Sequence, residues 1–322
     1  MKFNETSSLD TPILFLFFNR PIETKKVFKA LAKSKPKRLY LASDGAREIN
    51  NELDIVIKLR EFIIQNINWE CEVNTLFRDK NLGCKDAVSE AISWFFKTEK
   101  KGIILEDDCL PTESFFFFCE ELLRKYEHDM RIWHISGVNF QDDKTKIVES
   151  YYFSRLPNVW GWATWSNRWA LYNKELKNLN DESLNNILKD VVQNKSQLYY
   201  YKNVLNKVSN NEINTWDYSW NFSIWSNFGL SISPNKNLIS NIGFGPEATH
   251  TKDTGLFANL PTEEISFPLL HPKDIKPNKE ADGVLLSKTV ITPKDFILRK
   301  DLNFKHKLLM VYKKVKSLLK FQ

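Results

Sequence analysis

The sequence predicts an α/β protein built around a doubly wound, mostly parallel sheet flanked by helices. Two observations carry this prediction. In the first third of the chain, apolar runs of strand length alternate with longer segments of helical periodicity, which is typical of parallel strands joined by helices. The apolar runs are also continuous rather than alternating with polar residues, as expected for strands buried on both faces.

The elements of this first region follow in a regular order. Pro21 is expected to begin the first helix, because proline suits the first helical turn, and Pro36 is expected to end it. The apolar stripes of the next two helices repeat at helical spacing. The predicted strands are 13–18, 38–42, 72–77 and 102–105, and the later helices are 53–67 and 87–95.

The second half of the chain has weaker patterns. From 257 to 293 it has five prolines and little periodicity, which predicts an extended segment that wraps around the domain. The predicted elements before it are a helix over 113–126 with Thr112 as N-cap, strands over 132–136 and 151–154, a helical region over 181–208 and a helix from 217 to 225.

The positive charge is concentrated at the C-terminus. Residues 299–322 carry a net charge of +7, whereas the remainder carries −1. Because a nucleic-acid-binding protein is expected to have basic charge on its folded body, no nucleic-acid partner is predicted. Apolar residues recur at helical spacing among the lysines of the tail. This pattern is typical of a helix on an anionic membrane surface or of one docked on its own domain.

The cysteine pattern and hydropathy bear on location. Cys71, Cys84, Cys109 and Cys119 form no C-x-x-C pair and have no zinc-type spacing with histidine. They are expected to be reduced thiols of a cytoplasmic protein. No segment approaches the roughly 20 apolar residues that cross a bilayer. We therefore expect a cytoplasmic protein, peripheral on the inner face of the membrane if the tail binds lipid.

Polar residues follow each of the four predicted strands. In doubly wound sheets, ligands bind at the carboxyl ends of the strands. Those positions are held by Asn19-Arg20, by Ser43-Asp44-Gly45, by residues 78–83 and by Glu106-Asp107-Asp108. No glycine-rich phosphate loop is visible. A divalent cation on the three acids is the alternative way to bind a diphosphate, since Mg²⁺ and Mn²⁺ prefer oxygen ligands. A solvated turn is the competing interpretation of the acidic run.

The acidic run and its flanks resemble a known motif. Ile103-Ile104-Leu105-Glu106-Asp107-Asp108, followed by Pro111 and Phe115-Phe116, resembles the metal motif of GT-A glycosyltransferases, most closely the N-acetylglucosaminyltransferase I type. It is also similar to bacterial sugar transferases of surface-polysaccharide clusters. The resemblance covers roughly residues 11–250 at low identity. Further matching segments occur in the same order at 18–21, 43–45, 132–139, 160–162 and Trp216-Asp217.

The resemblance implies roles on the donor side. Asp108 would coordinate Mn²⁺ or Mg²⁺, and His250, a late histidine of the kind found in many GT-A enzymes, would be a second ligand. Arg20 and Asp44 would contact the base of the nucleotide. Glu106 and Asp107 would contact the ribose or a water that coordinates the metal. The implied nucleotide-sugar-binding residues are Arg20, Asp44, Asn81, Glu106 and Asp107.

The acceptor side has its own candidates. Asp217 would be the general base that takes the proton from the acceptor hydroxyl, although an N-cap role is equally compatible with its sequence position. Trp160 and Trp162 would stack on sugar faces, whereas packing in the core is the commoner use of tryptophan.

The expected function follows from these roles. We expect a metal-dependent, inverting glycosyltransferase that moves sugar from a nucleotide-diphosphate donor, with UDP-sugars favoured, to a glycan or lipid-linked acceptor in surface-polysaccharide or glycoconjugate biosynthesis. A retaining transferase, a sugar-nucleotide pyrophosphorylase and a non-catalytic carbohydrate-binding protein are the alternatives. The catalytic domain is expected over 1–298, with a donor half at about 11–140, an acceptor half at about 141–256 and a wrapping segment at 257–298. A basic amphipathic tail would occupy 299–322.

Overall fold

The computed structural model describes residues 8–49, 51–141, 147–177, 179–244 and 257–290. The strands in these ranges are β1 (Ile13–Phe17), β2 (Arg38–Ser43), β3 (Glu72–Phe77), β4 (Lys101–Glu106), β5 (Cys109–Pro111), β6 (Ile132–Ser136), β7 (Tyr151–Ser154), β8 (Trp162–Trp165), β9 (Leu230–Pro234) and β10 (Ile239–Asn241). The helices are α1 (Pro21–Lys33), α2 (Glu52–Gln65), α3 (Cys84–Phe95), α4 (Glu113–Lys125), α5 (Ser166–Trp169), α6 (Asp181–Leu188), α7 (Lys195–Ser209), α8 (Asp217–Ser226) and α9 (Lys279–Thr289).

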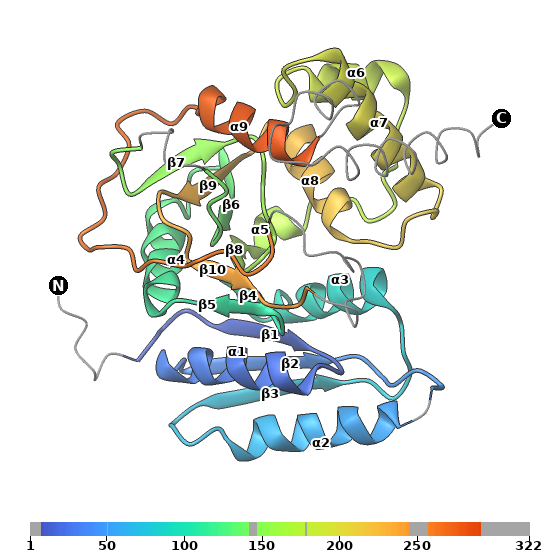
Figure 1. Cartoon of the computed structure of the whole chain (residues 1–322), viewed down its shortest axis with the longest axis vertical. Coiled ribbons are helices and arrows are strands. Elements are labelled where there is room, and N and C mark those ends of the chain that lie inside the picture. The colour runs from blue at the N-terminus through green and yellow to red at the C-terminus, as the bar shows by residue number, and fades with distance from the viewer. Residues whose placement is uncertain (1–7, 50, 142–146, 178, 245–256, 291–322) are drawn as a thin grey trace, which may run out of the picture.

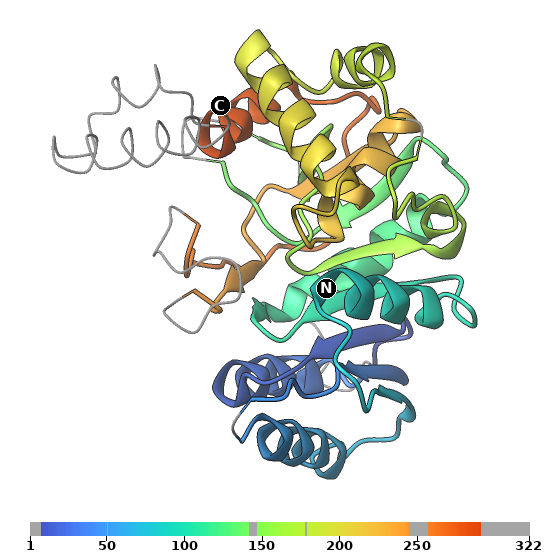
Figure 2. The same cartoon turned by 90° about the vertical axis from the view of Figure 1, so that its right-hand side faces the viewer.

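One mixed sheet forms the centre of the molecule. Its eight strands lie in the order β3-β2-β1-β4-β8-β6-β9-β7. Six of them run in one direction, whereas β8 and β7 run antiparallel to their neighbours. Figure 1 shows α1 and α2 beside the first strands of this order and α6 and α7 at the opposite end of the molecule; Figure 2 shows the same separation from the side. The predicted fold class, α/β with a mostly parallel sheet flanked by helices, is confirmed.

Helices cover both faces of the sheet. In β1, Phe15 and Phe17 pack in one hydrophobic cluster with α1, α2 and α4, whereas Leu14 and Leu16 pack in a second cluster with α3, α5 and α8. Because successive strand residues point to opposite faces, a continuous apolar run serves two cores at once. This is the physical reason for the unbroken run that the sequence shows at 13–17.

The two predicted halves of the domain share this sheet. Strand β8 lies between β4 and β6, pairing antiparallel with both, so a strand from the predicted acceptor half is inserted beside the strand that ends in the acids. A small second sheet pairs β10 with β5, directly after those acids. The last strand in the described residues, β10, therefore lies beside the turn that follows β4.

The predicted segment over 257–293 contains a helix that the sequence analysis missed. Residues 257–278 have no helix, as expected, but α9 begins at Lys279, two residues after Pro277. The side chain of Asn278 caps this helix by accepting the Ala281 N–H at 3.0 Å. Strands β5, β8, β9 and β10 were also missed.

The basic tail at 299–322 and His250 lie outside the described residues. Among the helices of the described part, none combines the length and apolar character needed to span a bilayer.

Candidate active site at the carboxyl ends of the parallel strands

A pocket of about 310 Å³ lies where β1, β2 and β4 end, a volume in the range typical of small-molecule sites. Its walls come from the strand-end loops and from the first turns of α3. The predicted donor-side residues that lie in the described ranges are all present among those walls. The polar and charged lining residues are Asn19, Arg20, Asp44, Arg47, Arg78, Asn81, Glu106, Asp107 and Asp108.

The three acids stand at the end of β4, where the chain turns before β5. Asp107 is buried, and its Oδ2 accepts the Phe18 N–H at 3.0 Å. The carboxylate of Glu106 lines the pocket and makes no hydrogen bond or ion pair within the described part of the chain. These acids are therefore held at the pocket wall by the strand, and one of them has no countercharge in direct contact.

Crowding of like charges marks this corner of the pocket. Burial, followed by the charge of Asp108, raises the pKa of Asp107 to about 7. Burial and the charges of Asp108, Asp107 and Asp217 raise the pKa of Glu106 well above its usual value. Buried carboxylates at short range favour protonation or a bound cation, since both reduce the repulsion. Such shifts are frequent at functional sites.

Arg20 provides positive charge beside the acids. Its Nη1 donates to Asp108 Oδ2 at 2.6 Å and lies 3.6 Å from Asp107 Oδ1. Although burial acts to lower it, the charges of Asp107 and Asp108 raise the pKa of Arg20 overall. The sequence analysis placed Arg20 at the nucleotide base. The structure places it in the pocket, but pairs its guanidinium with the predicted metal ligand.

Asp44 and Asn81 join two of the strand-end loops. The Asp44 carboxylate accepts the N–H groups of Leu82 and Gly83, both at 3.0 Å, and Asn81 Nδ2 donates to the Gly45 carbonyl at 2.8 Å. A Cβ on Gly45 would lie 2.3 Å from the backbone of Lys80, so only glycine permits this close approach. Both predicted residues line the pocket, and both also have a structural role.

The sequence analysis missed Arg47 and the residue that holds it. Arg47 Nη2 donates to Glu52 Oε1 at 2.6 Å, and its guanidinium carbon lies 5.6 Å from the centre of the Phe18 ring. The buried Glu52 also accepts from Asn19 Nδ2 at 2.7 Å, which ties the loop after β1 to the start of α2. Arg47 follows the end of β2 by only four residues, so the strand-end criterion that selected Arg20 could have found it.

Asp217 begins α8 and lies near the pocket without lining it. Its charge contributes, after burial, to the raised pKa of two pocket residues, Glu106 and Cys84. Its Oδ1 accepts the Tyr218 N–H at 2.8 Å and the Thr215 hydroxyl. Within the described residues Oδ2 has no hydrogen-bond partner. One oxygen is thus anchored, and the other is available to accept a proton.

Trp162 does not lie where the sequence analysis expected it. It is 0% exposed and stacks on His134, with ring centres 4.8 Å apart, and on Trp216 at 5.7 Å. A ring covered on both faces cannot stack on a sugar, so the predicted sugar contact of Trp162 is wrong. Trp160 is only partly buried, and it packs edge-on against Phe140 and Phe244. Its predicted role remains a prediction. We call the buried group beneath α8 the tryptophan cluster; it comprises Trp133, Trp162, Trp169, Trp216 and Trp220.

The acids fit a hard divalent cation that is shared with a ligand. Their donor atoms are all carboxylate oxygens, the type that Mg²⁺ and Mn²⁺ prefer. In the described ranges, however, no group of three or more acid, histidine or cysteine side chains is arranged to hold a metal by itself. The arrangement therefore suits a cation held by one or two carboxylates and completed by phosphate oxygens.

No family model and no curated protein matches the sequence. Among solved structures, the chain is similar to a mannosyltransferase from Pyrobaculum calidifontis in complex with GDP-Man and Mn²⁺, at 8% identity and TM-score 0.39, covering 70% of this chain and 73% of that one. It is also similar to residues 1–349 of TarS from S. aureus, at 10% identity and TM-score 0.38, covering 72% and 60%. A UDP-glucose pyrophosphorylase complexed with UDP-glucose matches at 10% identity and TM-score 0.34, covering 70% and 90%. At these TM-scores the similarities carry no argument about activity.

Proposed function

We propose that this chain is a glycosyltransferase of the GT-A type that uses a nucleotide-diphosphate sugar and a divalent cation. The observation that carries the proposal is the set of three acids at the end of β4, which line a pocket between the ends of the parallel strands. Asp217, on a separate helix, has one carboxylate oxygen without a partner in the described part and lies near enough to affect the pKa of Glu106.

Each of the donor-side residues is assigned its own role in binding. Asp108 would hold the cation together with the diphosphate, while Glu106 and Asp107 would contact the ribose or a water bound to the cation. Arg20 forms ion pairs with Asp107 and Asp108 and adds positive charge beside the phosphates. When bound, the cation supplies neutralisation of the negative charge that develops on the leaving diphosphate.

Asp217 acts on the acceptor side. Its Oδ2 takes the proton from the acceptor hydroxyl as the hydroxyl oxygen forms a bond to the anomeric carbon. The bond between that carbon and the diphosphate oxygen breaks, and its electron pair leaves with the diphosphate. Because attack and departure occur on opposite faces of the sugar, the configuration inverts.

The donor is proposed to be a UDP-sugar and the acceptor a glycan or lipid-linked hydroxyl, in surface-polysaccharide or glycoconjugate assembly. The basic tail at 299–322 is proposed to bring the enzyme to an anionic membrane surface on its cytoplasmic side. This part of the proposal rests on the charge pattern, since the tail lies outside the described residues.

A ligand-binding experiment tests the proposal. UDP should raise the melting temperature by about 5 °C at about a hundred times its Kd, and only with Mn²⁺ or Mg²⁺ present. Asp108→Ala should abolish this shift, whereas Asp54→Ala, an exposed acid of α2, should leave it intact. An equal shift in the Asp108 variant would overturn the metal assignment.

An activity panel then separates the enzyme classes. Each of several UDP- and GDP-sugars is incubated with Mn²⁺, and the release of nucleoside diphosphate is measured. Release of nucleoside diphosphate from one of these donors would support the proposed glycosyltransferase. Synthesis of a nucleotide sugar from a nucleoside triphosphate and a sugar 1-phosphate, without such release, would identify a pyrophosphorylase instead.

A further inference from the structure

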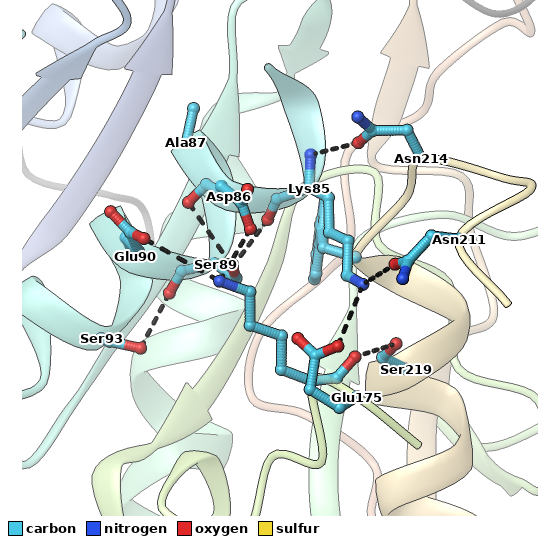
Figure 3. A network of polar contacts seen from close by, with 12 residues as sticks. Lys85, Asp86, Ala87, Ser89, Glu90, Ser93, Glu175, Asn211, Asn214 and Ser219 are labelled. Carbon is cyan, nitrogen blue, oxygen red and sulfur yellow. Dashed lines mark hydrogen bonds and ion pairs between the residues drawn. The ribbon is translucent and has the colours of Figure 1, made fainter. Parts of the chain in front are cut away.

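Polar contacts connect α3 with the segment that leads into α8 (Figure 3). The backbone N–H of Lys85 donates to Asn214 Oδ1 at 3.0 Å, and Lys85 Nζ donates to Asn211 Oδ1 at 3.0 Å. Lys85 Nζ also lies 3.7 Å from Glu175. Lys85 is only 7% exposed, so these contacts form inside the junction between the helices rather than on an open surface.

The Lys85 amide needs a partner from outside its own helix. It belongs to the first turn of α3, where backbone N–H groups have no acceptor within the helix. The residue at the N-cap position, Gly83, has no side chain that could supply one. Asn214 supplies the missing acceptor from a position 129 residues away in the sequence.

The contact joins the two parts of the proposed site. The first turns of α3 form a wall of the pocket, through Gly83, Cys84 and Ala87. Asn214 precedes Asp217, the first residue of α8, by three positions. The hydrogen bond from the Lys85 N–H to Asn214 therefore connects the wall of the proposed donor pocket with the segment that carries the proposed base.

A second connection runs in parallel through Lys174. Its Nζ lies 2.7 Å from Asp86 Oδ1 on α3, and its backbone carbonyl accepts the Ser219 hydroxyl of α8 at 3.1 Å. This ion pair is partly exposed, and exposed pairs hold geometry weakly. The bond from the Lys85 N–H to Asn214 joins the two segments directly, whereas the second connection runs through an intermediate residue.

We propose that Asn214 is a positioning residue for the transfer reaction: by capping α3, it fixes the start of α8 so that Asp217 stays at the edge of the nucleotide pocket. Asn214 acts through Asp217 and does not touch the reacting atoms. The proposal rests on the proposed function, since Asp217 is the base only if the chain is a transferase. Displacing a reacting group by about 1 Å can cost roughly a hundredfold in rate, so the loss of this tether should be visible in kcat.

The test compares Asn214→Ala with Asn210→Ala, a matched control on an exposed asparagine that ends α7. Amide hydrogen exchange over residues 217–221 should become about fivefold faster in Asn214→Ala and stay unchanged in the control. This measurement needs no substrate. Equal exchange rates in the two variants would show that Asn214 does not hold the start of α8 in place.

The kinetic readout separates positioning from simple destabilisation. With the donor chosen by the sugar panel, Asn214→Ala should lower kcat for hydrolysis about tenfold, with KM and the affinity for UDP with Mn²⁺ changed less than about twofold. Asn214→Asp keeps an acceptor oxygen and should restore kcat. A kcat equal to that of Asn210→Ala would refute the positioning role. A fully active Asp217→Asn would instead refute the proposed base, while the exchange result would still decide whether the tether exists.

Discussion

The pocket at the strand ends and the tryptophan cluster are adjacent regions with opposite physical character. The pocket gathers like charges, and one of its acids, Glu106, has no direct partner in the described part. The cluster is neutral and closed: each of its five rings packs against at least one other ring of the group, and its neighbour His134 is fully buried. Poorly compensated charge is retained at a cost to stability. The comparison indicates that the pocket serves function and the cluster serves the fold.

The comparison also explains why two segments that were both predicted to contact a ligand lie in different surroundings. Glu106-Asp107-Asp108 comes at the end of a strand, where the chain leaves the sheet and its side chains can reach a ligand. Trp162 is the first residue of β8 and lies opposite Ile104 of β4, but its side chain enters the core. The direction of the side chain, into the pocket or into the core, separates the two segments.

The largest effect is expected on the functional side, from Asp217→Asn. The amide keeps an oxygen for the Tyr218 N–H, so folding should change by less than about 0.5 kcal/mol. It cannot take the proton, so transfer should slow about 10³-fold, equivalent to roughly 4 kcal/mol of activation free energy. Steady-state kinetics and urea unfolding measure the two quantities. A stable variant with full transfer activity would contradict the role of Asp217 as the base.

The next largest effect is expected in the tryptophan cluster and concerns the free energy of unfolding. Trp162→Ala removes a ring that is 0% exposed and should lower the free energy of unfolding by about 3 kcal/mol. Trp160→Ala removes a partly buried ring and serves as the comparison, with a loss of about 1 kcal/mol. Chemical denaturation measures both values. Equal losses in the two variants would show that burial does not distinguish these tryptophans.

The smallest effect concerns His134. Its Nδ1 accepts the Trp220 indole N–H at 3.1 Å, and its Nε2 faces the Asn158 carbonyl at 2.9 Å, so the neutral tautomer protonated on Nε2 satisfies both contacts. Burial lowers the pKa of His134 to about 3. The unfolded chain, with a pKa near 6.5, takes up the proton first as the pH falls. Stability should therefore decline through this residue by about 2 kcal/mol between pH 7 and 5.

Comparison with His134→Gln isolates this contribution from those of the carboxylates. The variant should be less stable at pH 7, because the packing against Trp162 changes, but its stability should decline less steeply between pH 7 and 5. Urea unfolding at several pH values measures the two slopes. Parallel curves would mean that His134 takes up its proton equally readily in the folded and the unfolded protein.

Much of the first half of the fold could be predicted from the sequence. The bounds of β3 and β6 agree with the predicted strands, and those of β1, β2 and β4 differ by one or two terminal residues. Local signals suffice there, because the strands are continuous apolar runs and Pro21 marks the start of a helix. Strands β8 to β10 were missed, since they are short and are defined by pairing with distant segments.

Some features of the candidate site could likewise be predicted from the sequence, and others could not. Arg20, Asp44, Asn81 and the three acids could be placed together from sequence, because the ends of parallel strands meet at one edge. The pairing of Arg20 with Asp108, the burial of Trp162 and the contact between Asn214 and Lys85 could not. They depend on side-chain directions and on long-range packing that no local pattern encodes.

The insertion of β8 between β4 and β6 has a consequence for the order of synthesis. When the first 140 residues have left the ribosome, β4 and β6 have been made but the strand that joins them has not. One edge of β4, a strand whose Gly102–Leu105 core is fully buried in the finished protein, is then open, and an open apolar edge pairs readily with other chains. The pocket is lined by residues between 16 and 108, but the strand that ends in its acids keeps an open edge until residues 162–165 are made. A nascent chain therefore most needs protection from aggregation before this stretch is available.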